Sequence, residues 1–134
     1  MENKIKHLEI IQGVINRMAQ CSFLLKGWTV VLVSALFALA AKDSNILFIY
    51  LAYFPAIAFW ILDGYYLYQE RLYRNLYDKT RNTEESNIDF SMNKKEFEGK
   101  NKASWIDSIL SKTLLIFHLS IILTIIIVMI ISLK

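Results

Sequence analysis

Three long apolar segments, separated by polar stretches, dominate the chain at residues 23–41, 46–67 and 113–133. At about 1.5 Å of rise per helical residue, roughly 20 residues span the 30 Å hydrocarbon layer of a bilayer. The third segment has no formal charge between Lys112 and Lys134, and His118 is its only titratable side chain. The pattern predicts an all-α membrane protein with three transmembrane helices.

The stretch before the first apolar segment has a helical period of its own. Apolar residues recur there at spacings of three and four, at Ile5, Leu8, Ile11, Ile15 and Met18. This spacing predicts an amphipathic helix over residues 1–22, which continues toward the first span. Its apolar stripe could lie on the lipid surface or pack within or between subunits, and packing is the interpretation that we prefer.

The second apolar segment does not stop where a membrane would end. Helix-favouring residues continue to Arg81, which predicts one helix over residues 46–81, about 50 Å long. Its part beyond the membrane is residues 68–81. Tyr73 and Tyr77 lie too far out for an interfacial aromatic belt, so we expect them to pack against the N-terminal helix.

Polar residues connect these elements. Lys42, Asp43, Ser44 and Asn45 predict a tight outer turn. Residues 82–103 lose periodicity and predict a solvated polar linker, with a short helical piece near residues 94–98. Residues 104–112 are the interfacial start of the third helix, where Ser104 followed by Asp107 resembles a capping box.

Basic residues are distributed unevenly between the two predicted sides of the membrane. All of the 15 lysines and arginines except Lys42 and Lys134 lie before or near the start of the first span or in the connection between the second and third spans. The positive-inside rule assigns such segments to the cytoplasm. We therefore expect the N-terminus and the long connection inside, and the C-terminus outside.

Each predicted span contains one side chain that can be charged near neutral pH: Lys26, Asp63 and His118. Counted from Asp43 at the outer turn, Lys26 lies 17 residues back and Asp63 20 residues onward, so an ion pair at similar depth is expected. His118 enters the same inner-leaflet layer. The three could form a polar layer that gates permeation. Alternatively, Lys26 and Asp63 extend to the headgroups and His118 is a hydrogen-bonded packing residue.

Small and hydroxyl residues line particular faces of the spans. Small residues let membrane helices approach closely, and we expect packing within the first hairpin from Gly27, Ser34, Ala38 and Ala41 with Ala52 and Ala56. On the third helix, Thr113, Ser120 and Thr124 share a face that is a candidate pore-facing wall. Serine and threonine in membrane helices also commonly bond to their own backbone.

The chain has no recognisable enzyme motif. It lacks a glycine-rich phosphate loop with its lysine and a metal-binding cluster of histidine and cysteine. We therefore expect no catalysis, cofactor or metal. Three helices of one subunit cannot enclose an aqueous path, so the first hypothesis is a homo-oligomeric ion channel or pore gated by a cytoplasmic signal. The second is a non-conducting membrane anchor or interaction subunit that recruits a cytoplasmic partner.

The stretch at residues 4–28, KIKHLEIIQGVINRMAQCSFLLKGW, resembles the start of small bacterial membrane proteins encoded in anti-phage defence neighbourhoods. Over about residues 1–80 the chain resembles the transmembrane effector of Hailong-type defence. The resemblance implies a tetrameric channel, multi-pass in the bacterial inner membrane. A partner nucleotidyltransferase would make an oligonucleotide that restrains this channel, and opening would depolarise an infected cell.

Such an oligonucleotide would need basic contacts for its phosphates. Arg17, Arg71 and Arg74 on the predicted cytoplasmic helices are the candidates. The alternative is that these arginines only orient the chain in the membrane.

Overall fold

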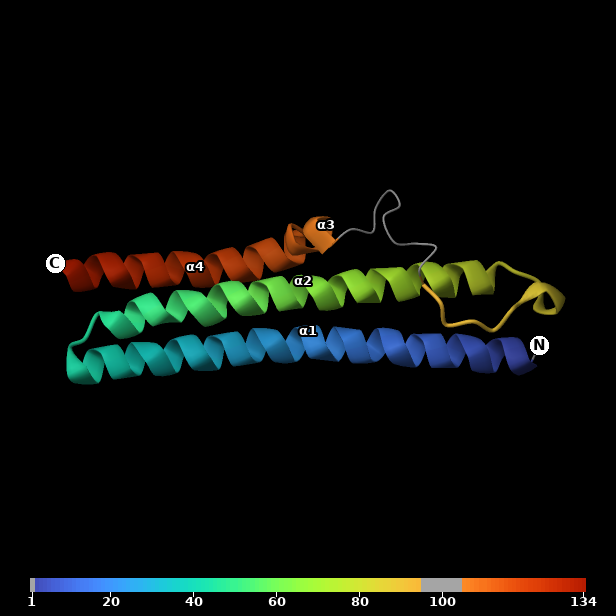
Figure 1. Ribbon diagram of the computed structural model, residues 1–134, viewed down its shortest axis with the longest axis horizontal. Coiled ribbons are helices and arrows are strands. Elements are labelled where there is room, and N and C mark those ends of the chain that lie inside the picture. Colours follow the sequence, from blue (N-terminus) through green and yellow to red (C-terminus); the bar gives the residue numbers. More distant parts are fainter. Residues whose placement is uncertain (1, 95–104) are drawn as a thin grey trace.

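The computed structural model describes residues 2–94 and 105–134, and this part of the chain is helical without strands. Two long antiparallel helices form a hairpin, and a third long helix lies beside one half of it (Figure 1). The elements in chain order are α1 (Glu2–Asp43), α2 (Leu47–Arg81), the 3-10 turn η1 (Glu85–Asn87), α3 (Trp105–Ile109) and α4 (Lys112–Leu133).

The long helices α1, α2 and α4 are each long and apolar enough to cross a membrane. Helix α1 is continuous, so the N-terminal amphipathic helix and the first span are one element. Helix α2 likewise continues through its predicted extension. The turn between them is tight: Ser44 adopts a left-handed φ of 52°, and the Asn45 side chain accepts a hydrogen bond from the Leu47 amide at 3.0 Å.

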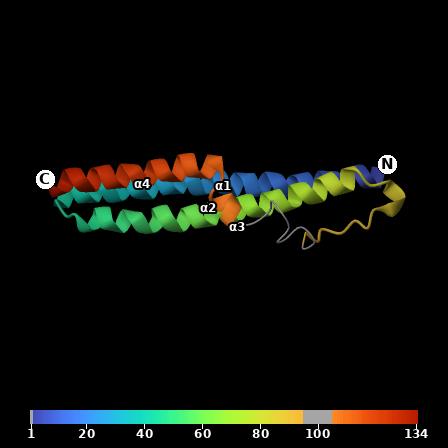
Figure 2. The ribbon, with the colours of Figure 1, turned by 90° about the horizontal axis from the view of Figure 1, so that it is seen from above.

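Helix α4 runs along the half of the hairpin that contains this turn, as Figure 1 and Figure 2 both show. We call that half the proximal half. The rest of the hairpin, residues 2–21 of α1 and 68–81 of α2, is the distal half. The proximal core joins all three long helices through Val33 and Ala40 of α1, Ile49, Ala52 and Ala56 of α2, and Ile125 of α4.

The distal half has an apolar core of its own. Ile11 and Ile15 of α1 are buried against Leu76 of α2, and the partly buried residues packed around them are Tyr73, Tyr77 and Met92. The expectation that the two tyrosines pack on the N-terminal helix is confirmed. The apolar stripe of that helix packs within the chain, although Ile5 at its end remains 52% exposed.

The described part of the segment that follows α2 contacts the N-terminal part of α1, although none of its residues is buried. Lys4 Nζ donates to the carbonyl oxygens of Arg81 and Thr83, at 2.9 and 2.8 Å. The ring of Phe90 meets His7 edge to face, with centroids 5.3 Å apart. The last carbonyls of a helix have no partner within it, and the Lys4 ammonium fills that need.

The third helix is interrupted, although we predicted one continuous start. Helix α3 ends at Ile109, and α4 begins after Ser111, whose side chain accepts a hydrogen bond from the Leu114 amide. Ser111 therefore supplies the N-cap of α4. The expected cap at Ser104 lies outside the described residues, as does nearly all of the helical piece expected at residues 94–98.

The small residues of α1 do not pack within the hairpin, so this expectation was wrong for α1. The exposed positions are Gly27, Ser34, Ala38 and Ala41, and a Cβ placed on Gly27 would meet no atom within 4 Å. Helix α1 instead buries the face that carries Thr29, Val33 and Ala40. On α2 the expected residues Ala52 and Ala56 are buried.

Candidate functional site

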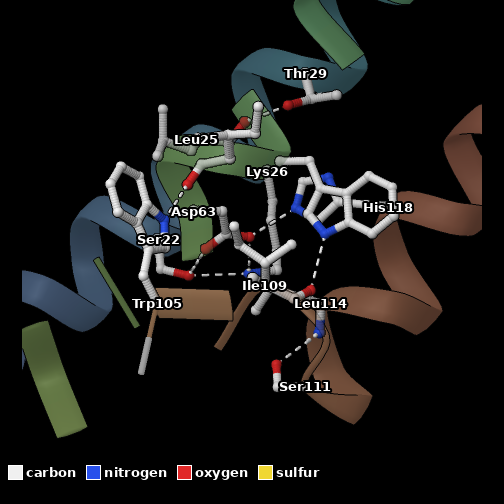
Figure 3. A network of polar contacts seen from close by, with 12 residues as sticks. Ser22, Leu25, Lys26, Thr29, Asp63, Trp105, Ile109, Ser111, Leu114 and His118 are labelled. Atoms are coloured by element: carbon white, nitrogen blue, oxygen red, sulfur yellow. Dashed lines mark hydrogen bonds and ion pairs between the residues drawn. The ribbon is translucent and has the colours of Figure 1, made fainter. Parts of the chain in front are cut away.

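Asp63 is the centre of a polar cluster that joins α1, α2 and α4 (Figure 3). Its side chain is fully buried. Oδ2 lies 2.6 Å from Lys26 Nζ and 2.8 Å from His118 Nε2, and Oδ1 accepts a hydrogen bond from Ser22. The ion pair predicted from helix depth is therefore present, and His118 lies in the same layer. Lys26 of α1 and His118 of α4 thus both contact the Asp63 carboxylate of α2.

Helical spacing explains how the hairpin builds this cluster. Ser22 and Lys26 are one turn apart on α1, so both reach Asp63, and Lys26 Nζ also donates to Ser22 Oγ at 2.9 Å. On α2, Asp63 lies seven residues after the buried Ala56, on the same face. A buried carboxylate without partners costs several kcal/mol. Here both oxygens accept hydrogen bonds, which offsets that cost.

The Lys26 ammonium also contacts an aromatic ring of α4. Its ammonium lies 5.9 Å from the centre of the Phe117 ring on α4, a distance at which a cation is attracted to an aromatic face. The lysine side chain is only 19% exposed. Its extension to the headgroups, the alternative reading of the sequence, does not occur in this structure.

His118 is 1% exposed and enclosed by aromatic rings. It stacks on Trp60 with centroids 5.7 Å apart and planes 7° apart, and it meets Phe117 edge to face at 5.0 Å. An ionised Asp63 accepts hydrogen bonds only, so Nε2 carries the hydrogen in this contact. Nδ1 has no hydrogen-bond partner among the described residues.

Sequence reasoning missed two members of this site, Ser22 and Trp60. Ser22 lies one turn before Lys26, and that spacing was the available signal. Trp60 lies one turn before Asp63 on the same face of α2, and its indole Nε1 donates to the carbonyl oxygen of Ile109 at 3.0 Å. Neither residue has a charge that would mark it in an apolar segment.

The candidate pore-facing residues Thr113, Ser120 and Thr124 are exposed on α4. Ser120 Oγ donates to the Ile116 carbonyl at 2.5 Å, and Thr124 Oγ1 donates to the Ser120 carbonyl at 2.8 Å. These two hydroxyls therefore bond to their own helix, as membrane serines and threonines often do. Within one chain this face borders no other described helix.

The three candidate ligand arginines have different environments. Arg17 is exposed on α1. Arg71 is half-buried, with Nη1 3.4 Å from Ser108 Oγ on α3. Arg74 is exposed and pairs with Glu70 at 3.4 Å. Among the described residues, no contact gathers the three into one site.

A polar cavity of about 170 Å³ lies between the end of α2 and the segment that follows it. Ligand pockets typically measure about 300–1,000 Å³, so this cavity is small for a nucleotide. Its lining includes Thr80, Thr83, Asn87, Asp89 and Ser91. No group of three or more His, Cys, Asp or Glu side chains in the described part of the chain could hold a metal ion.

Comparisons with protein families, with curated proteins and with solved structures found no match to this chain. The interpretation of the site therefore depends on its own geometry.

Proposed function

We propose that this protein is a homo-oligomeric ion channel or pore-forming membrane effector, gated from the cytoplasmic side. The main support for this proposal is the buried cluster of Lys26, Asp63 and His118, where all three long helices meet. Ionisable side chains inside membrane spans are costly, and they commonly mark ion pathways or proton relays. The cluster lies close to the α3–α4 junction, where a displacement of α4 would disrupt it.

The exposed face of α4 supports the assembly of several copies. The interior of one chain is closed at the cluster, because Asp63 and His118 are buried and packed. Thr113, Ser120 and Thr124 point away from the hairpin. Copies that meet around α4 would bring these hydroxyls to a shared axis, where they could line water. A tetramer is the arrangement that the resemblance implies.

The distribution of basic residues supports the orientation and location that we propose. With the N-terminus inside, the distal half of the hairpin lies in the cytoplasm, and the proximal half lies in the inner membrane of a bacterium. A signal at this half, an oligonucleotide made by a partner nucleotidyltransferase, would control the pore, and opening would depolarise an infected cell. Arg17 and Arg74 are exposed for such a contact, whereas Arg71 is directed to α3.

A non-conducting membrane anchor is the second candidate, and one observation favours it. Asp63 finds all its partners within one subunit, at Ser22, Lys26 and His118. A satisfied buried network rigidifies a fold without any conducting role. Such an anchor would recruit a cytoplasmic partner through its distal half.

Oligomer size and conductance separate the two candidates. We expect light scattering of the protein in detergent to give a multiple of 15.6 kDa, and planar bilayers to show currents. Lys26→Met should change the open fraction or the voltage dependence. Lys42→Met, the same change at an exposed lysine at the far end of α1, should alter neither. A monomer, or a membrane that stays non-conducting, would support the anchor.

A further inference from the structure

Trp60 contacts both the buried cluster and the last residue of α3. Its ring stacks on the imidazole of His118, with nearly parallel planes. Its indole N–H donates to the carbonyl oxygen of Ile109, which ends α3, at 3.0 Å. One side chain of α2 thus connects a short helix outside the cluster with a residue inside it.

Helix α3 lies directly on the backbone of α2. Gly64 provides the space, because a Cβ at this position would come within 3.1 Å of the Ile109 Cα atom. The absence of a side chain allows this close approach. A second indole supports the contact at the first residue of α3, since Trp105 Nε1 donates to the Ile61 carbonyl at 3.2 Å.

The position of α3 also restricts where the first turn of α4 lies, because the connection between the two helices is short. Only Leu110 and Ser111 separate Ile109 from the first residue of α4, and Ser111 caps that helix. Since α3 and α4 are separate helices, α3 could leave α2 without unwinding α4. Such a departure would remove the acceptor of the Trp60 N–H.

We propose that Trp60 is a positioning residue that couples the docking of α3 on α2 to the contact between His118 and Asp63. With α3 docked, the hydrogen bond to Ile109 holds the indole ring parallel to the imidazole. When α3 leaves, the ring turns to find another acceptor, and His118 loses the surface that orients it toward Asp63. The consequence of this coupling for channel opening rests on the proposed function.

A double-substitution experiment tests the coupling without reference to conductance. Trp105→Phe removes one indole donor that holds α3, and the contacts of Trp105 are with Ile61 and Tyr65, which lie outside the cluster. The readout is the set of ring nitrogen resonances of His118, measured by NMR on the full chain in lipid nanodiscs. Trp28→Phe, the same change at an exposed tryptophan of α1, is the matched control.

With Trp60 present, we expect Trp105→Phe to shift the His118 resonances. It should also speed amide exchange in α3 about fivefold, as expected from the loss of one hydrogen bond. With Trp60→Phe, exchange in α3 should still accelerate while the His118 resonances no longer respond to Trp105→Phe. A response of His118 that is equal in both backgrounds would overturn the coupling, because the two changes would then simply add.

Two further arms keep the test decisive. If Trp60→Phe does not fold, benzothienylalanine at position 60 keeps the shape of the ring and lacks only the N–H. Conductance is then recorded for the same set: Trp105→Phe should raise the open fraction, and the change at Trp60 should abolish that increase. Coupled His118 resonances in a protein without conductance would reject the channel and retain the coupling. Conductance together with a His118 response that is equal in both Trp60 backgrounds would retain the channel and reject the coupling.

Discussion

Different chemistry holds the two halves of the α1–α2 hairpin together. The distal half is joined mainly by apolar contacts among Ile11, Ile15 and Leu76. The proximal half adds a fully buried carboxylate that accepts hydrogen bonds from α1 and α4. Apolar contacts tolerate small displacements, whereas hydrogen bonds weaken steeply with poor geometry. The distal contacts therefore hold α1 and α2 together, and the cluster determines how α1, α2 and α4 align.

The two partners of α2 also differ in the extent of their attachment. Helix α1 contacts α2 in both halves. Helix α4 is beside the proximal half alone and buries only Leu114, His118 and Ile125. We infer that α4, which packs against the proximal half alone, is the long helix that separates first.

Removal of the central carboxylate should have the largest effect. Asp63→Ala leaves the Lys26 ammonium without its counterion, and the loss of one partner of a buried pair costs about 3–5 kcal/mol. Thermal unfolding of the purified protein in detergent measures this loss. Asp63→Ala combined with Lys26→Met should recover part of it, because no orphaned charge remains. A double variant less stable than Asp63→Ala would contradict this account of the cluster.

Truncation in the distal core should have a smaller and local effect. Ile15→Ala should cost about 2 kcal/mol, because it creates a cavity between two helices that can partly close. The ring resonances of His118 should not change, since Ile15 lies in the other half. Ile5→Ala, at a half-exposed position of the same helix, is the control. Equal losses of stability from Ile15→Ala and Ile5→Ala would show that the packing of α1 on α2 in the distal half does not depend on the Ile11–Ile15–Leu76 core.

Removal of an exposed hydroxyl from α4 should have the smallest effect on stability. Thr124→Val keeps the shape of the side chain and loses a hydrogen bond to its own backbone, so stability should change by less than about 0.5 kcal/mol. If the α4 face lines a path, the single-channel conductance should fall. Thr29→Val, the same change at a buried threonine bonded to the Leu25 carbonyl, should leave conductance unaltered. Equal conductance in both variants would remove Thr124 from the path.

Helix length, hairpin topology and the depth of charged groups could be predicted because each follows from counting along the chain. The approach of Lys26 to Asp63 followed from the two antiparallel helices alone. The packing of Tyr73 and Tyr77 followed from the length of α2. These features need no knowledge of which side chains interlock.

The orientation of each span about its own axis could not be predicted. An amphipathic helix shows its buried face as an apolar stripe, but a span that is apolar on all sides has no such marker. The stripe that begins at Gly27 was therefore assigned to the wrong face. The role of Trp60 and the break before Ser111 depend on contacts between α2 and α3, which periodicity does not report.

The continuity of α1 gives the molecule a mechanical property. The helix has 42 residues without a break, and at 1.5 Å per residue it is about 63 Å long. Without a break, the two ends of the helix are expected to move together as one rigid body. A tilt of about one degree at one end displaces the other by about 1 Å. With Ser22 and Lys26 near its middle, a force at the distal end that tilts the whole helix, unlike a local closure around Ile15, reaches the cluster as a change in hydrogen-bond distance.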